Sequence, residues 1–412
     1  MEKNPRNAAI GFIFITLLID VIGFGIIIPV LPKLLAEMNH ISINEASKYG
    51  GYLLFSFALA QFVFSPVMGN LSDQLGRRPV LLFSLLGFGI DYIILAFAPS
   101  YGWLLVGRII AGITGASFTT AAAYIADIST PENRAKNFGM IGAAFGLGFI
   151  IGPLLGGLLG HLSLRAPFYA AAALSLLNLA YGYFVLPESL SKDLRRPFDW
   201  KRANPLGTLK QLGKYKQIAW LLVAYFMLYM GSHAVQSTWN YFTMYHFHWN
   251  EAMVGFSLAF VGVLAGVVQA GLAQKAGNLF GVGKSVYIGF ALYTLGMFLF
   301  AFASKTWMMY VFLIPYCFGG IGMPNLQSLM VGKVPANEQG ELQGGLTSLM
   351  SVTTIFGPML MTHIFYLFTS KSAPIVFPGA AFFLGGIFML ISFIITYLLL
   401  KDYDKKNEGH RI

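Results

Sequence analysis

Charge is scarce along this chain. Its 412 residues include 27 Lys and Arg and 17 Asp and Glu, and charged residues make up 11% of the sequence. Soluble domains usually contain about 25% charged residues, and the apolar share here reaches 56%. So few charges do not cover a water-soluble body. The composition therefore argues against a soluble multidomain enzyme and predicts a polytopic helical membrane protein.

Cysteine is nearly missing as well. Cys317 is the only one in the sequence, which excludes a disulfide framework and a cysteine-based metal cluster. The stretch from Gly277 to Ser285 is glycine-rich, but its glycines are too far apart for a phosphate-binding loop and no strand precedes it. We therefore expect no enzymatic activity, no resident metal and no cofactor.

Apolar stretches long enough to cross a hydrocarbon core of about 30 Å recur from end to end. The first stretch carries Asp20 and is too long for the core of a signal peptide, so we expect it to be retained. The sequence predicts twelve transmembrane helices, at Ala8–Leu31, Tyr49–Met68, Val80–Ala98, Trp103–Ile125, Phe138–Leu159, Pro167–Leu186, Ile218–Tyr241, Met253–Leu272, Ser285–Ala303, Trp307–Met330, Leu346–Phe368 and Ile375–Leu400.

The basic residues predict the orientation of these helices. Most of the 27 lie in the tails, in the central loop and in the other loops on the side of the N-terminus. The loops on the opposite side hold only Lys33, Lys48, Arg165, Lys305 and Lys371. By the positive-inside rule, both termini are expected in the cytoplasm. The net charge of +10 is then a signal of membrane topology, and binding to nucleic acid is not expected.

The two halves of the chain echo each other. Three pairs of glycines are separated by the same number of residues, namely Gly76 and Gly281, Gly139 and Gly344, and Gly152 and Gly357. We predict an N-terminal six-helix bundle at 1–186, a cytoplasmic linker at 187–217, and a C-terminal bundle with its tail at 218–412. Such parallel repeats resemble the organisation of major facilitator transporters, whose substrate site lies near mid-membrane between the halves.

The loop after the second predicted span, from Gly69 to Pro79, resembles the signature loop of the major facilitator superfamily. Gly76 permits a left-handed turn at its end. The second copy keeps Gly281 but has Asn278 in the place of Asp73. The charges either obey the positive-inside rule and no more, or form a gate that closes the cytoplasmic side. We favour the gate and predict that it is formed by Asp73, Arg77, Arg78, Asp127 and Arg134.

The fifth predicted span carries small residues every four positions. These are Gly148, Gly152 and Gly156, and Pro153 follows the second of them. Small residues permit close packing of helices, and a proline bends the helix. The pattern resembles the glycine-proline motif of antiporters in the same superfamily and favours export over import.

Three ionisable residues lie inside the predicted spans of the first half: Asp20, Asp91 and Arg108. Counting about 1.5 Å per residue from the ends of their spans places all three at a similar depth. A charge in the membrane is costly unless it is paired or faces water, so such residues are candidates for function. We predict that they carry or tune the coupled proton. The alternative is a structural ion pair between Arg108 and either aspartate.

The predicted spans of the second half contain no Asp or Glu. They carry histidines, amides and many aromatic residues instead. Such a lining suits a planar or amphipathic organic molecule, by analogy with apolar pockets that contain a few polar groups. We predict that the substrate cavity is lined by Gln236, Asn240, Tyr293, Asn325 and Gln327.

Several stretches resemble the tetracycline/proton antiporters, among them Asp20 to Pro32, Gly107 to Ala116, Tyr124 to Asp127 and Gly319 to Gln327. The resemblance covers nearly the whole chain apart from the central loop and the tails. It implies a major facilitator fold with twelve helices in two six-helix repeats around a central cavity. It also implies that Asp20, Asp91 and Arg108 act in transport and that Asp73, Arg77 and Asp127 act in gating.

By this resemblance the chain exports a drug-like molecule by alternating access in exchange for protons, with tetracycline the leading candidate. The proton gradient is the energy source, and the substrate is able to travel as a chelate of a divalent metal. A monomer in the bacterial inner membrane is expected. Transport of an endogenous metabolite or siderophore is the alternative, and a receptor or scaffold is a third. Tyr293 and Ala265 stand where the family usually has an acid and a histidine, so coupling would rest on Asp20 and Asp91.

Overall fold

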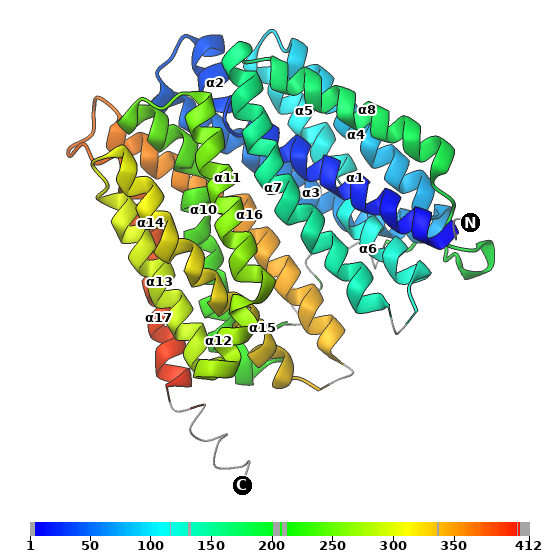
Figure 1. Ribbon diagram of the computed structural model, residues 1–412. Helices are drawn as coiled ribbons and strands as arrows, with labels where there is room; N and C mark the ends of the chain where they lie inside the picture. The colour runs from blue at the N-terminus through cyan, green and yellow to red at the C-terminus, as the bar shows by residue number, and fades with distance from the viewer. Residues whose placement is uncertain are drawn as a thin grey trace. The chain divides into compact units, whose positions relative to one another are not determined.

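The computed structural model describes residues 5–115, 117–130, 133–200, 207, 212–335, 338–401 and 403, and the side chains of 5–9, 117 and 134–136 lie outside this description. All secondary structure in these residues is helical, and 12 segments are long and apolar enough to span a membrane (Figure 1). This confirms the predicted all-α polytopic class. The chain forms two compact units, Met1–Pro205 with Trp249–Ala259, and Leu206–His248 with Phe260–Ile412.

The first unit consists of eight α-helices and a short 3₁₀ turn, joined by the beginning of α11. Its helices are α1 (Pro5–Ile27), α2 (Leu31–Asn39), α3 (Ile43–Leu75), α4 (Arg77–Phe97), α5 (Tyr101–Thr114), α6 (Ser117–Ile128), α7 (Arg134–Leu162), α8 (Ala166–Val185) and η1 (Lys192–Leu194). Within it, α1 lies along α7, and α4 packs on both α5 and α8.

The second unit repeats this plan. Its helices are η2 (Lys216–Ile218), α10 (Ala219–Phe247), α11 (Glu251–Val267), which begins in the first unit, η3 (Val268–Leu272), α12 (Ala273–Phe280), α13 (Val282–Ala301), α14 (Thr306–Phe318), η4 (Gly319–Ile321), α15 (Gly322–Gly332), α16 (Gln339–Thr369) and α17 (Ala380–Leu400). Here α10 lies along α16, and α13 packs on both α14 and α17. The packing of α1 on α7, and of α4 on α5 and α8, is therefore matched in the second unit by that of α10 on α16, and of α13 on α14 and α17.

Each predicted span lies on one of these membrane-length helices, and the differences are at the ends. The helix α1 ends at Ile27, before Pro29, and the separate short helix α2 was not expected. The helix α3 is much longer than the predicted Tyr49–Met68. Apolar composition marks only the part of a helix suited to the membrane. The backbone of α3 remains helical from a capping box, formed by Ser42 and Glu45, to its polar end.

Two glycines join helices at the same place in each unit. Gly76 links α3 to α4 with a φ of 109°, and Gly281 links α12 to α13 with a φ of 87°. Residues with a Cβ rarely adopt positive φ, whereas glycine does so readily. The repeat predicted from glycine spacing therefore extends to the backbone conformation of this turn.

The fourth spanning segment of each unit is interrupted. In the first unit, α5 ends at Thr114, with Gly115 as its C-cap, before α6 begins at Ser117. In the second unit, α14 contains Pro315 and passes through the 3₁₀ turn η4 into α15. Proline lacks the N–H that an α-helix requires, so a break near it is expected.

The segment that follows α8 is held against the end of α3. Asn70 Nδ2 donates to the Asp199 carbonyl oxygen at 2.6 Å, and the Arg196 backbone N–H donates to the Asp73 carbonyl oxygen at 3.1 Å. Residues 187–200, predicted as the first part of a linker, are therefore attached to the first unit along much of their length.

Candidate functional site

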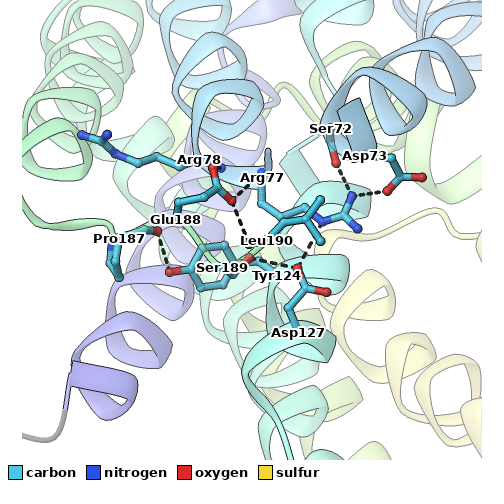
Figure 2. Close-up of polar contacts among 10 residues, drawn as sticks. All are labelled: Ser72, Asp73, Arg77, Arg78, Tyr124, Asp127, Pro187, Glu188, Ser189 and Leu190. Atoms are coloured by element: carbon cyan, nitrogen blue, oxygen red, sulfur yellow. Dashed lines mark hydrogen bonds and ion pairs between the residues drawn. The ribbon is translucent and has the colours of Figure 1, made fainter. Parts of the chain in front are cut away.

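Arg77, at the start of α4, joins three elements of the first unit. Its Nη1 lies 2.5 Å from Asp73 Oδ1 and donates to Ser72 Oγ at 2.6 Å, and both partners belong to α3. Its Nε lies 3.2 Å from Asp127 Oδ2 at the end of α6. Figure 2 shows the guanidinium between the two carboxylates. Three of the five residues predicted to form a charge cluster are thus brought together.

The other two predicted members of the cluster, Arg78 and Arg134, are not seen to join it. The Arg78 side chain turns away from this cluster (Figure 2). Its Nη2 donates to the Tyr183 carbonyl oxygen at 2.6 Å, and its guanidinium lies 5.7 Å from the centre of the Tyr183 ring. The side chain of Arg134 lies outside the described residues.

Glu188 was not predicted, yet its carboxylate lies at the centre of this site. Its Oε1 accepts hydrogen bonds from the backbone N–H groups of Arg77 at 2.8 Å and of Leu190 at 3.0 Å. Its Oε2 accepts from the Arg78 N–H at 3.2 Å. The first N–H groups of a helix lack partners within the helix, and a carboxylate there is favoured by the helix dipole. Because Gly76 has no side chain, Glu188 caps α4 from a distance.

Gly76 is also needed for space. A Cβ at this position would overlap Glu188 Oε2 and would lie 3.0 Å from Arg195 Nη2. The sequence carries one signal for this role: Glu188 is an acid two residues after the predicted span Pro167–Leu186, at the start of a strongly basic stretch. An acid in that place needs a partner with positive charge or free N–H groups.

Two further contacts bind the residues on either side of Glu188 to α6. Ser189 Oγ donates to Asp127 Oδ2 at 2.9 Å, and Tyr124 OH donates to the Pro187 carbonyl oxygen at 2.9 Å. Asp127 therefore accepts hydrogen bonds from both Arg77 and Ser189.

The exposure of the charges sets the strength of the cluster. The side chains of Asp73, Asp127 and Arg77 are 39%, 21% and 11% exposed. Partly exposed ion pairs are each worth about 1 kcal/mol or less. Several such contacts hold α3, α4 and α6 together, yet each is weak enough to break and re-form. This is the property that a gate requires.

Asp91 and Arg108 form a buried ion pair between α4 and α5. Arg108 Nε donates to Asp91 Oδ1 at 3.2 Å, and Nη2 contacts Oδ2. The Asp91 side chain is 0% exposed and the Arg108 side chain is 11% exposed. A Cβ at Gly107 would lie 2.7 Å from Asp91 Oδ1, so glycine at this position lets the carboxylate approach α5.

Asp20 lies on α1 and is 7% exposed. Tyr92 lies between it and the ion pair. The Tyr92 ring centre is 5.9 Å from the Arg108 guanidinium, and its hydroxyl packs against Gly23, less than one turn beyond Asp20. Asp91 has the Arg108 guanidinium beside it, and Tyr92 connects this pair to the part of α1 that carries Asp20.

The glycines predicted to form a packing face lie against α1. A Cβ at Gly148 would lie 2.6 Å from Val21 Cβ, one at Gly152 would lie 2.8 Å from the Ile22 carbonyl oxygen, and one at Gly156 would overlap the Ile26 carbonyl. Pro153 takes part as well, because a Cβ at Gly25 of α1 would lie 2.8 Å from its Cδ. Helices α1 and α7 therefore approach each other at backbone distance.

A second face of α7 carries its own close contact. A Cβ at Gly157 would lie 2.6 Å from the Glu251 carbonyl oxygen, and one at Gly255 would overlap the Pro153 carbonyl oxygen. The start of α11 is thereby packed on α7 within the first unit. Glycines on two sides of α7 thus admit two neighbouring backbones.

The residues predicted to line a substrate cavity lie on three helices of the second unit. On α10, Gln236 is exposed and Asn240 is buried. Tyr293 lies on α13, and its ring packs on the backbone of η4, because a Cβ at Gly319 would lie 2.6 Å from Tyr293 Cγ. On α15, Gln327 is half-buried.

The fifth of these residues, Asn325, makes a structural contact. Asn325 Nδ2 donates to the carbonyl oxygens of Ala273 at 3.1 Å and Ile321 at 2.8 Å, which ties α12 to α15.

Among the described residues, no group of three or more His, Cys, Asp or Glu side chains is arranged to hold a metal ion.

Comparisons with known proteins identify what this arrangement resembles. The profile of the Major Facilitator Superfamily matches residues 13–278 and 221–411. Among curated proteins, the chain is 42% identical over 359 residues to the class C tetracycline resistance protein of Escherichia coli, covering 87% of this chain and 90% of that protein. It is 36% identical over 396 residues to the class B protein of Escherichia coli, covering 95% and 97%.

Solved structures agree on the fold. A human organic anion transporter superimposes with a TM-score of 0.71 at 23% identity, covering 96% of this chain and 100% of that one. A nucleoside transporter superimposes with a TM-score of 0.76 at 13% identity, covering 95% and 98%.

Proposed function

The chain belongs to the major facilitator superfamily and stands among its tetracycline resistance proteins, and from this premise we propose that it exports a drug-like small molecule in exchange for protons. Tetracycline is the leading candidate, because the relatives that share 35–42% of their residues with this chain over most of its length carry that name. The chain is a multi-pass membrane protein and not an enzyme.

The Arg77 cluster is the observation that best supports transport. Alternating access needs contacts that close one side of the protein and then open. Arg77 holds Asp73 and Asp127 in partly exposed ion pairs, which are individually weak. We propose that this cluster lies at the cytoplasmic side, as the placement of the basic residues indicates, and that it opens when the transporter faces the cytoplasm.

The proton pathway is proposed from the buried charges of the first unit. The Asp91 carboxylate is paired with Arg108, and Asp20 is buried on the membrane-length helix α1, where an ionisable residue is a candidate for function. We propose that Asp20 binds and releases the coupled proton. Asp91 and Arg108 would then position the Tyr92 ring, which lies between the ion pair and α1.

We take the remaining features of the proposal from the resemblance to the family. The substrate would enter from the cytoplasm, as free drug or as a chelate of a divalent metal, and would contact Gln236, Asn240, Tyr293, Asn325 and Gln327. The protein would work as a monomer in the bacterial inner membrane. Transport of an endogenous metabolite is not favoured, since the similarity to tetracycline resistance proteins covers most of the chain.

The test is resistance together with proton exchange. The gene would be expressed in a bacterial strain that lacks its own efflux pumps, and growth would be measured on a drug panel that includes tetracycline. Everted membrane vesicles would then be energised, and tetracycline uptake followed with proton release. We expect raised tolerance to tetracycline and a proton signal on addition of drug. Unchanged growth on every drug, with a well-inserted protein, would contradict the proposal.

A further inference from the structure

The second unit contains a buried histidine that the proposed function does not use. His233 lies midway along α10 and is 3% exposed. At about 1.5 Å per residue, it lies about 20 Å from either end of the helix. Its Nε2 lies 3.3 Å from Oγ1 of Thr353, which is near the middle of the neighbouring helix α16 (Figure 1). An ionisable group at the middle of a membrane span is a candidate for function.

The hydrogen bonds of Thr353 determine which ring nitrogen carries the hydrogen. Thr353 Oγ1 donates its one hydrogen to the Met350 carbonyl oxygen at 2.6 Å. The hydroxyl oxygen is then left to accept a hydrogen bond from His233, so Nε2 carries the N–H and Nδ1 carries a free lone pair. Nδ1 is buried and has no hydrogen-bond partner among the described residues. The ring therefore presents an unoccupied base inside the unit.

Among the described residues of α10 and of the elements packed on it, no carboxylate lies close enough to compensate a proton on this ring. The other titratable side chains on α10, and on η2, α16 and α17 that pack against it, are Tyr225, Tyr229, Tyr241, Tyr245, His246, Lys216, Glu341, His363, Tyr366 and Tyr397. Glu341 is the only carboxylate among them, and it lies in the first turn of α16, about 18 Å along the helix from Thr353. A buried cation without a partner costs several kcal/mol, so the ring is neutral in this arrangement.

The internal repeat relates the position of His233 in the second unit to that of Asp20 in the first. Gly152 and Gly357 occupy the same position in the two halves, on α7 and α16. A Cβ at Gly152 would lie 2.8 Å from the Ile22 carbonyl oxygen of α1, while one at Gly357 would overlap His233 Cδ2 of α10. Asp20 lies two residues before Ile22. His233 therefore lies in the second unit at nearly the level that Asp20 has in the first.

We propose that His233 is a second proton-binding residue of the transport cycle, and that Thr353 positions its ring. This rests on the proposed function of proton-coupled export. When water reaches the ring, Nδ1 takes a proton from hydronium and leaves water, giving an imidazolium with hydrogens on both nitrogens. On return to the buried arrangement the proton passes back from Nδ1 to water, and the neutral ring keeps its bond to Thr353. Proton coupling then has one group in each unit.

Two variants separate proton binding from packing. His233→Gln keeps an amide N–H that is able to reach Thr353 but does not bind a proton near neutral pH. Thr353→Val keeps the titratable ring and removes the hydrogen bond. Purified wild type and variants would be placed in proteoliposomes with an internal pH dye, and tetracycline would be the probe. Exchange of labelled for unlabelled tetracycline without a pH gradient needs no net proton movement, whereas accumulation against a gradient does.

We expect His233→Gln to exchange tetracycline at nearly the wild-type rate and to lose most of its gradient-driven accumulation. One exchanged proton sustains about a tenfold drug gradient per unit of pH difference, so a fall in the pH dependence of accumulation measures the lost proton directly. Thr353→Val should remain coupled with a shifted pH profile. Wild-type accumulation and proton flux in His233→Gln would overturn the proposal, and so would equal loss of exchange and accumulation, because that result indicates a packing role.

A measurement on the unaltered protein adds a second test. Nitrogen NMR of the histidine-labelled wild type should show one buried ring with its hydrogen on Nε2 when the drug is absent. If the signal that disappears in His233→Gln instead has its hydrogen on Nδ1, the proposed orientation of the His233 ring by Thr353 is wrong. Failure of the proposed function has a different signature: wild type itself would then exchange no protons with tetracycline, and this inference would fall with it.

Discussion

Lys33 of α2 and Glu251 at the start of α11 form an ion pair across 218 sequence positions, with Nζ 2.8 Å from Oε1 and 3.0 Å from Oε2. The Glu251 side chain is 3% exposed and the Lys33 side chain is 38% exposed. Glu251 also lies in the first turn of its helix, where a carboxylate is favoured by the helix dipole. The pair therefore ties α2 to the place where α11 packs on α7.

Lys33→Met should destabilise the protein, because it leaves the buried Glu251 carboxylate without its cation. Since Lys33 is partly exposed, we expect a loss of about 1–2 kcal/mol and a lower midpoint of thermal unfolding in detergent. Lys371→Met, which removes a charge from an exposed loop residue, is the matched control. The double variant Lys33→Met with Glu251→Gln should recover most of the loss, and a double variant less stable than either single one would contradict the pair.

Glu188→Ala should weaken both the turn after α3 and the proposed gate. The change removes the acceptor of three backbone N–H groups, and the loss of a helix cap costs about 1 kcal/mol. We expect slower drug efflux from cells and a lower unfolding midpoint. Asp193→Asn alters an exposed acid of the same segment and should change neither. Equal behaviour of the two variants would show that capping by Glu188 is dispensable.

Asp73→Asn should abolish transport while leaving membrane insertion intact. The amide keeps the size of the side chain but not its charge, so of the two ion pairs that the Arg77 guanidinium makes, with Asp73 and with Asp127, only the second remains. Drug accumulation in everted vesicles and the amount of protein in the membrane would be measured together. Asp73→Glu keeps the charge and should retain part of the activity. Full transport by Asp73→Asn would rule out a gate at this position.

Glycines of α7 should respond to alanine according to what lies beside them. Gly142 and Gly146 have open space where a Cβ would be placed, whereas Gly152 and Gly156 face the backbone of α1. Alanine at either open position removes a flexible residue from a helix and should stabilise it by about 0.5–1 kcal/mol. Alanine at Gly152 or Gly156 should lower stability and efflux, because two backbones must move apart.

Comparison of the unfolding midpoints of these four variants checks this expectation directly. A uniform effect along α7 would indicate that helix propensity, and not contact with α1, decides the outcome.

Local pattern predicted most of the fold and part of the site. Apolar runs located all twelve spans, and glycine spacing predicted the turn that Gly76 and Gly281 share. Asp73, Arg77 and Asp127 were predictable as neighbours because each lies at the same end of its span. These predictions succeeded because the position of a residue along its helix determines how far it lies from the end of the helical bundle.

Contacts between distant segments were not predictable in the same way. Glu188 reaches the start of α4 across 111 positions, and the approach depends on where the segment after α8 runs. Lys33 and Glu251 are farther apart still. Arg78 is the same residue type as Arg77 and follows it directly in the chain. At the first turn of α4, however, the Arg77 side chain reaches Asp73, whereas the Arg78 side chain reaches Tyr183. A side chain's direction depends on the tertiary structure, which hydropathy does not report.

The attachment of residues 187–200 to the end of α3 has a consequence for dissecting the protein into fragments. The hydrogen bonds from Asn70 and Arg196 place this segment with the first unit, and the boundary between the units follows Pro205. A gene divided before Pro187 would separate α4 from the carboxylate that caps it. A gene divided after Pro205 would keep Glu188 with α4, but Trp249–Ala259, which also belongs to the first unit, would lie on the other product. The two co-expressed fragments would then have to reassemble to restore the Lys33–Glu251 pair.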